Sequence, residues 1–214
     1  MSMTAIVTAR PKVLIVSAIA ARPRHALTRI IEPKNHVRTS LALVPQMGDP
    51  AVGKSALTQM FQSGGQRFPK AYNMTCGVEF CVKATAVEGT DEAVELHLFD
   101  TAGQDVFAEI MPQYWEGAKG VILVYDVTRA HTLEACSIWY RRLLDETGGE
   151  SLPGVLVANK MDLRERTCVS RQDGQQMAQN LGMHFFEASA LDGVGIDDPF
   201  ACIGKLTRDL RPEA

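Results

Sequence analysis

Short apolar runs alternate with longer amphipathic segments along most of the chain. The apolar runs are rich in Val, Leu, Ile and Phe, which is typical of strands buried on both faces of a sheet. They lie at residues 93–99, 120–127, 154–160 and 184–189. Helical periodicity is found at residues 54–63, 105–117, 132–146, 170–181 and 197–210. This alternation predicts βα units and therefore an α/β fold, with a mostly parallel sheet and helices on both faces.

One pair of strands is expected to run antiparallel. The apolar segment 77–87 is followed by 93–99 across the short polar stretch "EGTDE", which predicts a hairpin. With a first strand before residue 48, the sheet has six strands and one antiparallel edge strand. Ligands of such folds bind outside the carboxyl ends of the parallel strands.

The stretch "GDPAVGKSAL", residues 48–57, contains the spacing G-x-x-x-x-G-K-S. Glycines at these positions let the backbone curl so that its N–H groups and the next helix's amino terminus face a phosphate chain. Lys54 would bring positive charge to the outer phosphates, and Ser55 would offer a hydroxyl to Mg²⁺. The alternative is a Gly-rich turn that caps an ordinary helix. The candidate phosphate-binding residues are Gly48, Asp49, Pro50, Ala51, Val52, Gly53, Lys54, Ser55 and Ala56.

A second motif, "LFDTAGQD" at residues 98–105, follows an apolar strand. Asp100 is placed to hold a metal through water. Gly103 can present a backbone N–H to a terminal phosphate, and Gln104 can orient an attacking water. Alone, D-T-A-G is a turn signal. After a P-loop, it indicates a nucleoside triphosphate hydrolase.

Two further motifs predict recognition of guanine. In "NKMD" (159–162), Asp162 can accept hydrogen bonds from N–H groups that guanine has and adenine lacks, so the wrong base would leave the carboxylate unpaired. Asn159 and the stem of Lys160 would flank the ring. "EASA" (187–190) ends the last strand and contributes Ser189 and Ala190, whose backbone N–H can approach the guanine oxygen.

Together these motifs resemble those of a Ras-superfamily small GTPase of the Rab type. The resemblance spans residues 48–210 and includes "MTCGVEF" (74–80), "FDTAGQD", "YDVT" (125–128), "NKMD" and "EASA". It implies GTP or GDP and Mg²⁺ as cofactors, slow GTP hydrolysis, and two loops, at about 67–80 and 102–115, that become ordered around the γ-phosphate. By the same resemblance Thr75 joins Ser55 and Asp100 at the metal and Phe68 packs against the base. The implied catalytic residues are Lys54, Thr75 and Gln104.

Within the Rab type, the chain is similar to the Rab-like GTPases of intraflagellar transport. The similarity lies in "GDPAVGKSALTQMFQSGG", "YNMTCGVEF" and "SLPGVLVANK", and in a short tail (211–214) without prenylation cysteines. It implies a place in cilia or flagella, in complex B, with a small β-sandwich subunit as partner. The exchange factor and the GTPase-activating protein are not indicated. The alternatives are a Rab of vesicle trafficking and a structural subunit whose nucleotide is constitutive.

Composition limits the partners and the cellular compartment that we expect. A formal net charge of −3 gives no reason to expect nucleic acid as a partner. Five cysteines without a C-x-x-C pair favour a reducing, cytoplasmic compartment. No run approaches the ~18 apolar residues of a membrane span, and without a terminal cysteine to prenylate we expect no intrinsic membrane anchor.

Residues 1–47 form an atypical amino-terminal segment with seven Lys or Arg and one acid, Glu32. The strand that feeds the P-loop should lie here, and "PKVLIV" (11–16) has the composition for it. The nearer "SLALV" (40–44) is followed by Pro45, which cannot donate to a central ladder. We therefore favour an insertion or gene-model artefact that splits the first strand from its loop. A targeting segment and a disordered basic arm are the alternatives.

A few other residues receive weaker expectations. Trp115 and Trp139 are expected to pack in the core, with an effector contact as the alternative for Trp115 and for Phe80. His97, His131 and His184 lack metal-ligand spacing. Pro50 departs from the family pattern, because proline removes one N–H from the phosphate loop.

Overall fold

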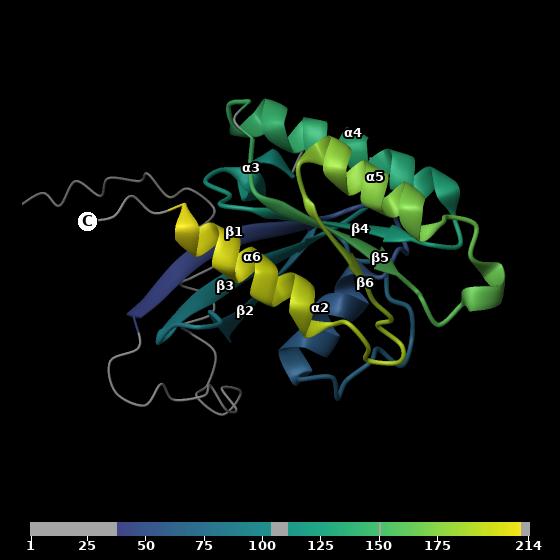
Figure 1. Cartoon of the computed structure of the whole chain (residues 1–214), viewed down its shortest axis with the longest axis horizontal. Helices are drawn as coiled ribbons and strands as arrows, with labels where there is room; N and C mark the ends of the chain where they lie inside the picture. The colour runs from purple at the N-terminus through teal and green to yellow at the C-terminus, as the bar shows by residue number, and fades with distance from the viewer. Residues whose placement is uncertain (1–37, 104–110, 150, 211–214) are drawn as a thin grey trace, which may run out of the picture. The chain divides into compact units, whose positions relative to one another are not determined.

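The computed structural model describes residues 38–103, 111–149 and 151–210, all within the unit Lys34–Ala214. These residues form a six-stranded sheet in the order β2-β3-β1-β4-β5-β6 (Figure 1). All neighbouring strands are parallel except β2 and β3, which pair antiparallel. The strands are β1 (Arg38–Met47), β2 (Val78–Ala86), β3 (Glu92–Thr101), β4 (Val121–Asp126), β5 (Gly154–Asn159) and β6 (His184–Glu187). The predicted α/β fold with one antiparallel edge strand is confirmed.

Helices cover both faces of the sheet (Figure 1). The helices α2 (Lys54–Ser63) and α6 (Asp197–Asp209) pack on one face, where the rings of Phe61 and Phe200 stack with centroids 3.9 Å apart. On the other face lie α3 (Pro112–Trp115), α4 (Ala130–Thr147) and α5 (Arg171–Leu181). A short 3₁₀ helix, η3 (Arg164–Arg166), precedes α5. The sheet is thus the middle of three layers, with two apolar cores.

The local sequence explains where these elements begin and end. Every residue of β4 and β5 is buried, as expected for parallel strands covered on both faces. The helix α5 begins with a capping box, in which Ser170 and Asp173 each bond the other's backbone N–H. It ends at Gly182, whose left-handed φ of 67° closes the last turn.

The first strand is not where we favoured it. Strand β1 runs from Arg38 to Met47 and leads directly into Gly48, whereas residues 11–16 lie outside the described part of the chain. Residues 38–47 therefore belong to the six-stranded sheet and not to a separate amino-terminal segment. The three interpretations of what precedes them remain hypotheses.

The objection based on Pro45 fails because of the register. The ladder between β1 and β3 continues through the pair Pro45–Phe99, but β1 pairs with β4 only from Gln46 onward. The carbonyl of Leu43 accepts from the N–H of Lys119, just before β4. Backbone groups alternate sides along a strand, so Pro45 faces β4 where that ladder has not yet begun. The missing donor interrupts no bond to β3.

The expectations for the aromatic residues have different outcomes. Trp115 and Trp139 are both buried, so the alternative effector role for Trp115 is wrong. Phe80 is half-buried and lies edge-on to His97 and beside Phe99; its role as an effector contact stays a prediction. All five cysteines are unpaired.

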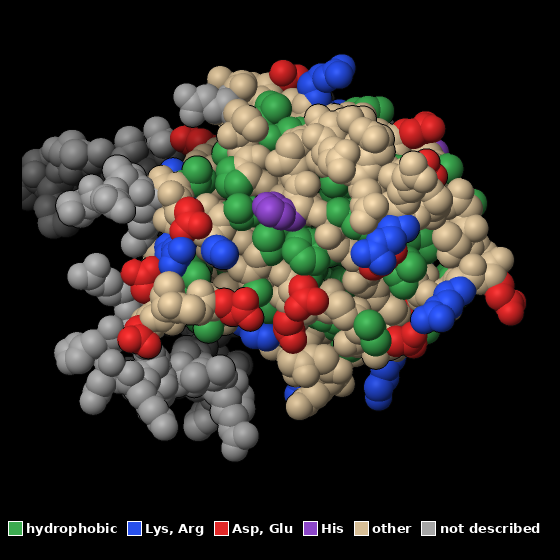
Figure 2. Space-filling view, in the orientation of Figure 1, with side chains coloured by type: hydrophobic (Ala, Val, Ile, Leu, Met, Phe, Trp, Pro, Cys, Tyr) green, Lys and Arg blue, Asp and Glu red, His purple; other side chains and the backbone are tan. Residues whose placement is uncertain are grey.

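The visible surface mixes charges of both signs. Figure 2 shows acidic and basic side chains interspersed with apolar ones on one face. Among the described residues, no group of three or more His, Cys, Asp or Glu side chains is placed to bind a metal. Within the same ranges, no helix has the length and apolarity needed to cross a bilayer.

Substituting Val44 tests the position of β1. Its side chain is 0% exposed in the core between the sheet and α6, so Val44→Ala should lower the free energy of unfolding by about 2 kcal/mol. Urea denaturation measures this change. A matched Val16→Ala substitution would produce a comparable loss if residues 11–16 were the central strand instead, and such a result would contradict the assignment.

Candidate functional site

The loop between β1 and α2 depends on close backbone approach. A Cβ on Gly48 would lie 2.2 Å from the carbonyl oxygen of Val124, and one on Gly53 would lie 2.2 Å from Nδ2 of Asn159. Both glycines also have positive φ, 145° and 101°. Ala51 has a φ of 58°, which is uncommon for a residue with a Cβ. The motif's glycines are therefore required by both space and backbone conformation.

The side chain of Lys54 lies at the centre of this loop. Lys54 is only 6% exposed, and its Nζ donates to the carbonyl oxygens of Gly48 at 2.8 Å and Asp49 at 2.9 Å. Burial lowers the pKa of Lys54 to about 8, although the nearby carboxylates of Asp100 and Asp49 oppose the shift. The amine remains mostly protonated at neutral pH, so the loop surrounds a fixed positive charge.

The three predicted metal ligands come together next to Lys54. Oγ of Ser55 and Oγ1 of Thr75 are 2.9 Å apart, and Thr75 donates to Oδ2 of Asp100 at 3.5 Å. Burial raises the pKa of Asp100 to about 6, partly offset by the Ser55 hydrogen bond and the charge of Lys54. Within the described residues, its buried Oδ1 has no hydrogen-bond partner. Because an unpaired buried carboxylate oxygen is costly and hydroxyls and carboxylates are hard oxygen ligands, this group fits Mg²⁺.

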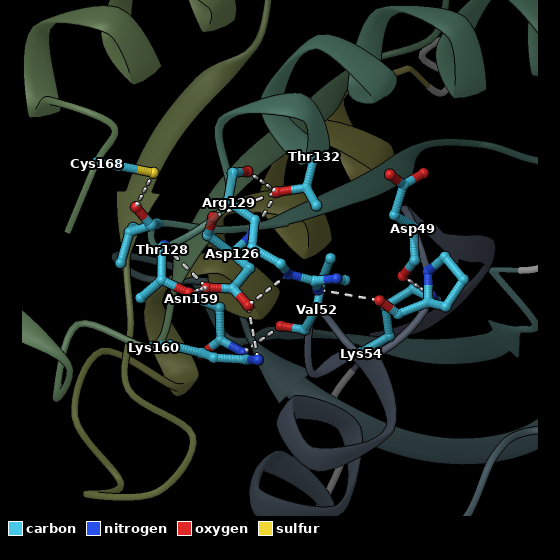
Figure 3. A network of polar contacts seen from close by, with 12 residues as sticks. Asp49, Val52, Lys54, Asp126, Thr128, Arg129, Thr132, Asn159, Lys160 and Cys168 are labelled. Carbon is cyan, nitrogen blue, oxygen red and sulfur yellow. Dashed lines mark hydrogen bonds and ion pairs between the residues drawn. The ribbon is translucent and has the colours of Figure 1, made fainter. Parts of the chain in front are cut away.

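The carboxylate of Asp126, at the end of β4, lies between Lys160 of the "NKMD" motif and Arg129 at the start of α4 (Figure 3). Its Oδ2 lies 2.7 Å from Nζ of Lys160 and 3.0 Å from Nε of Arg129. Its Oδ1 accepts from the N–H and the hydroxyl of Thr128 at 2.9 and 2.7 Å. Burial alone would raise the pKa of Asp126, but the hydrogen bonds from Lys160 and Thr128 outweigh it and leave the pKa below its usual value.

Asn159 links the phosphate loop to the loop after β6. It is 1% exposed; its Nδ2 donates to the carbonyl of Val52 at 2.8 Å, and its Oδ1 accepts from the N–H of Ala190 at 3.2 Å. Both polar atoms of the side chain therefore have protein partners. The expected contact of Asn159 with a base stays a prediction, as does the approach of the Ala190 N–H to the guanine oxygen.

Asp162 is oriented by its neighbours in the loop after β6. Its Oδ1 accepts from Oγ of Ser189 at 2.7 Å, and the same hydroxyl accepts from the N–H of Asp192 at 3.0 Å. Ser189 is buried. The structure thus gives Ser189 a supporting part, while Asp162 keeps a second carboxylate oxygen for another donor.

A cavity of about 770 Å³ opens over the phosphate loop, within the range usual for small-molecule sites. It contains the predicted phosphate, metal and base-edge groups Lys54, Ser55, Thr75 and Phe68, but not Asp162 or Ala190. Among the described residues, the lining is formed by Pro50, Ala51, Gly53, Lys54, Ser55, Ala56, Gln59, Phe68, Pro69, Lys70, Ala71, Tyr72, Asn73, Met74, Thr75, Glu79, Thr101, Gly103 and Lys160.

Gly103 closes the cavity against the phosphate loop. A Cβ there would lie 2.5 Å from the carbonyl carbon of Asp49 and 2.6 Å from the nitrogen of Pro50. No larger residue fits without moving the loop. The predicted catalytic residue Gln104, which follows, lies outside the described residues.

Comparison with known proteins agrees with this geometry. The Ras family model matches residues 44–209, and the chain therefore belongs to the Ras family. Proteins of this family are GTPases that bind GTP or GDP with Mg²⁺. The match begins within β1, in keeping with the observed strand.

The similar proteins include intraflagellar transport subunits. The chain is 43% identical over 158 residues to the intraflagellar transport protein 27 homolog of Mus musculus, covering 74% of this chain and 85% of that protein. It is 39% identical over 177 residues to intraflagellar transport protein 27 of Chlamydomonas reinhardtii, covering 81% and 87%. The Ras-related protein Rab11E of Lotus japonicus is 36% identical over 155 residues, covering 72% and 69%.

Three polar residues of the site were missed by the sequence motifs. Asp126 lies within "YDVT" and Arg129 follows it directly. That segment contributed only to the resemblance, so it was a usable signal. The indole Nε1 of Trp139, in α4, donates to Oδ1 of Asp49 at 3.0 Å. No local pattern indicates this contact, because the two residues are 90 positions apart.

Neutralising Asp126 should change stability in a pH-dependent way. Because its pKa is lowered by folding, its contribution is complete above the unfolded value near 3.9 and is lost as pH falls through the lower folded value. Asp126→Asn should reduce the free energy of unfolding by roughly 2 kcal/mol at pH 7. The difference from wild type should shrink below about pH 3.

Denaturant titrations from pH 2 to pH 7 measure this dependence. Asp145→Asn is a suitable control, because it removes the same charge at an exposed position of α4. Equal stability of Asp126→Asn and wild type at pH 7 would contradict the role assigned to this carboxylate.

Proposed function

We propose that this protein is a small GTPase that binds GTP and GDP with Mg²⁺ and hydrolyses GTP slowly. The observation that carries the proposal is the convergence of Lys54, Ser55, Thr75 and Asp100 beside one cavity. A buried amine and a buried, incompletely paired carboxylate suit a ligand that is itself a metal-bound polyphosphate. The Ras family membership supports the same conclusion.

The phosphate end of the site would work by positioning and charge. The N–H groups of residues 51–56 would bind the phosphate chain together with the amino terminus of α2, and Lys54 would place its amine at the outer phosphates. Ser55, Thr75 and Asp100 would hold Mg²⁺. When bound, the ion neutralises charge that develops on the phosphate oxygens during hydrolysis.

The base end would select guanine through Asp162. Ser189 donates to Oδ1 of this carboxylate and thereby fixes its orientation. The other oxygen, Oδ2, would then accept from an N–H group of the base. Adenine offers no matching ring N–H and would leave the carboxylate poorly paired. Asn159 would act mainly by holding the base loop against the phosphate loop.

Hydrolysis would depend on Gln104 and Gly103. Gln104 would orient the attacking water, and the N–H of Gly103 would contact the terminal phosphate. We expect an unaided turnover of about 10⁻⁴ to 10⁻² per second, the range of related chemistry. Pro50 contributes no N–H, so the γ-phosphate has one donor fewer on this side of the loop.

Replacing one carboxylate oxygen of Asp162 by an amide nitrogen tests whether this residue recognises guanine. Asp162→Asn replaces one acceptor by a donor, which opposes guanine but suits xanthine, whose exocyclic group is an oxygen. GDP affinity should fall at least about 100-fold, as expected from unpaired buried groups, while XDP affinity should rise. Fluorescence titration with both nucleotides measures the two constants.

Asp192→Asn provides the control, because Asp192 lies near Asp162 in the loop after β6 and only its backbone N–H contacts Ser189. An Asp162→Asn variant that binds GDP as tightly as wild type would exclude Asp162 as the base-recognition residue.

We also propose that the protein works in intraflagellar transport. Several similar proteins named for that process come from animals, Trypanosoma brucei brucei and Chlamydomonas reinhardtii, at 37–43% identity. The Ras-related proteins Rab11E and RABA6a match at 36% and 37%. By this resemblance the protein would act in the cytoplasm and cilium within complex B, next to a small β-sandwich subunit. Vesicle trafficking by a Rab is the second candidate.

Comparing partner affinity in the GDP form and in the GTP form tests whether the protein is a switch or a structural subunit. A ligand shifts a conformational equilibrium only if it binds the two states differently. For a switch, intraflagellar transport subunits captured from ciliated cells should bind the form loaded with a non-hydrolysable GTP analogue at least about 10-fold more tightly than the GDP form. Equal binding would favour a structural role, and capture of vesicle-trafficking proteins alone would contradict the ciliary assignment.

A further inference from the structure

Helix α4 contacts two successive residues of the phosphate loop. Oδ1 of Asp49 accepts from the indole N–H of Trp139 at 3.0 Å, and the carbonyl of Pro50 accepts from an NH₂ group of Arg129 at 3.0 Å. Arg129 is the N-cap residue of α4, and its Nε is held by Asp126 at 3.0 Å. We call the two contacts made by Arg129 and Trp139 the α4 tie.

The loop segment held by the α4 tie is unusual. Pro50 has a fixed φ and no N–H, and Ala51 adopts a left-handed φ of 58°. Such conformations persist only where the surroundings over-determine them. The α4 tie supplies two directed hydrogen bonds from outside the loop, while Lys54 holds the carbonyl of Asp49 from inside.

The peptide between Asp49 and Pro50 also lies next to Gly103. The built Cβ position of Gly103 lies 2.5 Å from the carbonyl carbon of Asp49 and 2.6 Å from the nitrogen of Pro50. The Asp49–Pro50 peptide thus lies against the backbone of Gly103, while the α4 tie holds the side chain of Asp49 and the carbonyl of Pro50. A shift of this peptide toward Gly103 would displace Gly103 within the cavity that both Pro50 and Gly103 line.

We propose that Arg129 and Trp139 are positioning residues that hold the Asp49–Pro50 peptide and thereby set the preference for GTP over GDP. The inference rests on the proposed guanine-nucleotide binding. Neither residue lines the cavity, so their effect passes through the loop. Because Pro50 and Gly103 border the place of the terminal phosphate in the proposed site, loosening the tie weakens the hold on GTP more than on GDP.

Trp139→Phe gives the sharpest test in the full-length chain. It removes the indole N–H and keeps an aromatic ring in the core. Stopped-flow release of fluorescent GDP and of a fluorescent, non-hydrolysable GTP analogue, with Mg²⁺, measures the effect. We expect about 10-fold faster release of the analogue, as for loss of one charge-assisted hydrogen bond. GDP release should change less than about threefold.

Two further variants separate positioning from general stability. Tyr140→Phe is the matched control, because it removes a hydroxyl of α4 that bonds the carbonyl of Leu152 at 3.0 Å; both release rates should stay as in wild type. Arg129→Lys keeps the charge beside Asp126 but loses the planar fork that also reaches Pro50. It should change selectivity in the same direction as Trp139→Phe.

The outcomes distinguish this inference from the function on which it rests. If Trp139→Phe speeds the release of both nucleotides equally, or of neither, the residue has no part in selectivity and the inference is overturned. A wild-type chain that binds neither nucleotide would instead contradict the proposed function. In a chain that already carries Asp49→Ala, Trp139→Phe should cause no further change, because its hydrogen-bond partner is already absent.

Discussion

The site depends on one buried side chain, Asn159, which holds the phosphate loop and the base loop together. Its amide bonds the carbonyl of Val52 and the N–H of Ala190, and the close approach that it requires leaves no room for a Cβ on Gly53. Asp126 makes a parallel connection through Lys160 and Arg129. Both residues end parallel strands, so the sheet itself fixes the distance between the two ends of the site.

Much of the fold could be predicted from the sequence, because helical and strand periodicity are local. Helix α2 begins and ends where the pattern indicated, and the β2–β3 hairpin closes on "EGTDE". Strand β1 could not be placed from the sequence. The rule against proline in central strands does not consider the register, which decides whether the missing N–H was needed for a ladder hydrogen bond. Only the observed pairing shows that Pro45 faces β4 before that ladder begins.

The site was predicted in part. The motifs identified Lys54, Ser55 and Asp100, and the family resemblance added Thr75. The structure brings these side chains together. A motif does not say which polar atoms the protein itself uses, so the supporting hydrogen bonds of Asn159 and Ser189 were unexpected. The contacts of α4 with the phosphate loop join residues 79 and 90 positions apart, and no short-range pattern carries such information.

The central claim is that a guanine nucleotide and Mg²⁺ bind where these loops meet. Isothermal titration of the nucleotide-free, full-length chain with GDP and with ADP, both in Mg²⁺, tests it most directly. The account predicts one GDP per chain, bound at least about 100-fold more tightly than ADP, because only guanine pairs with the Asp162 carboxylate. Absence of GDP binding by folded protein, or equal affinity for GDP and ADP, would contradict it.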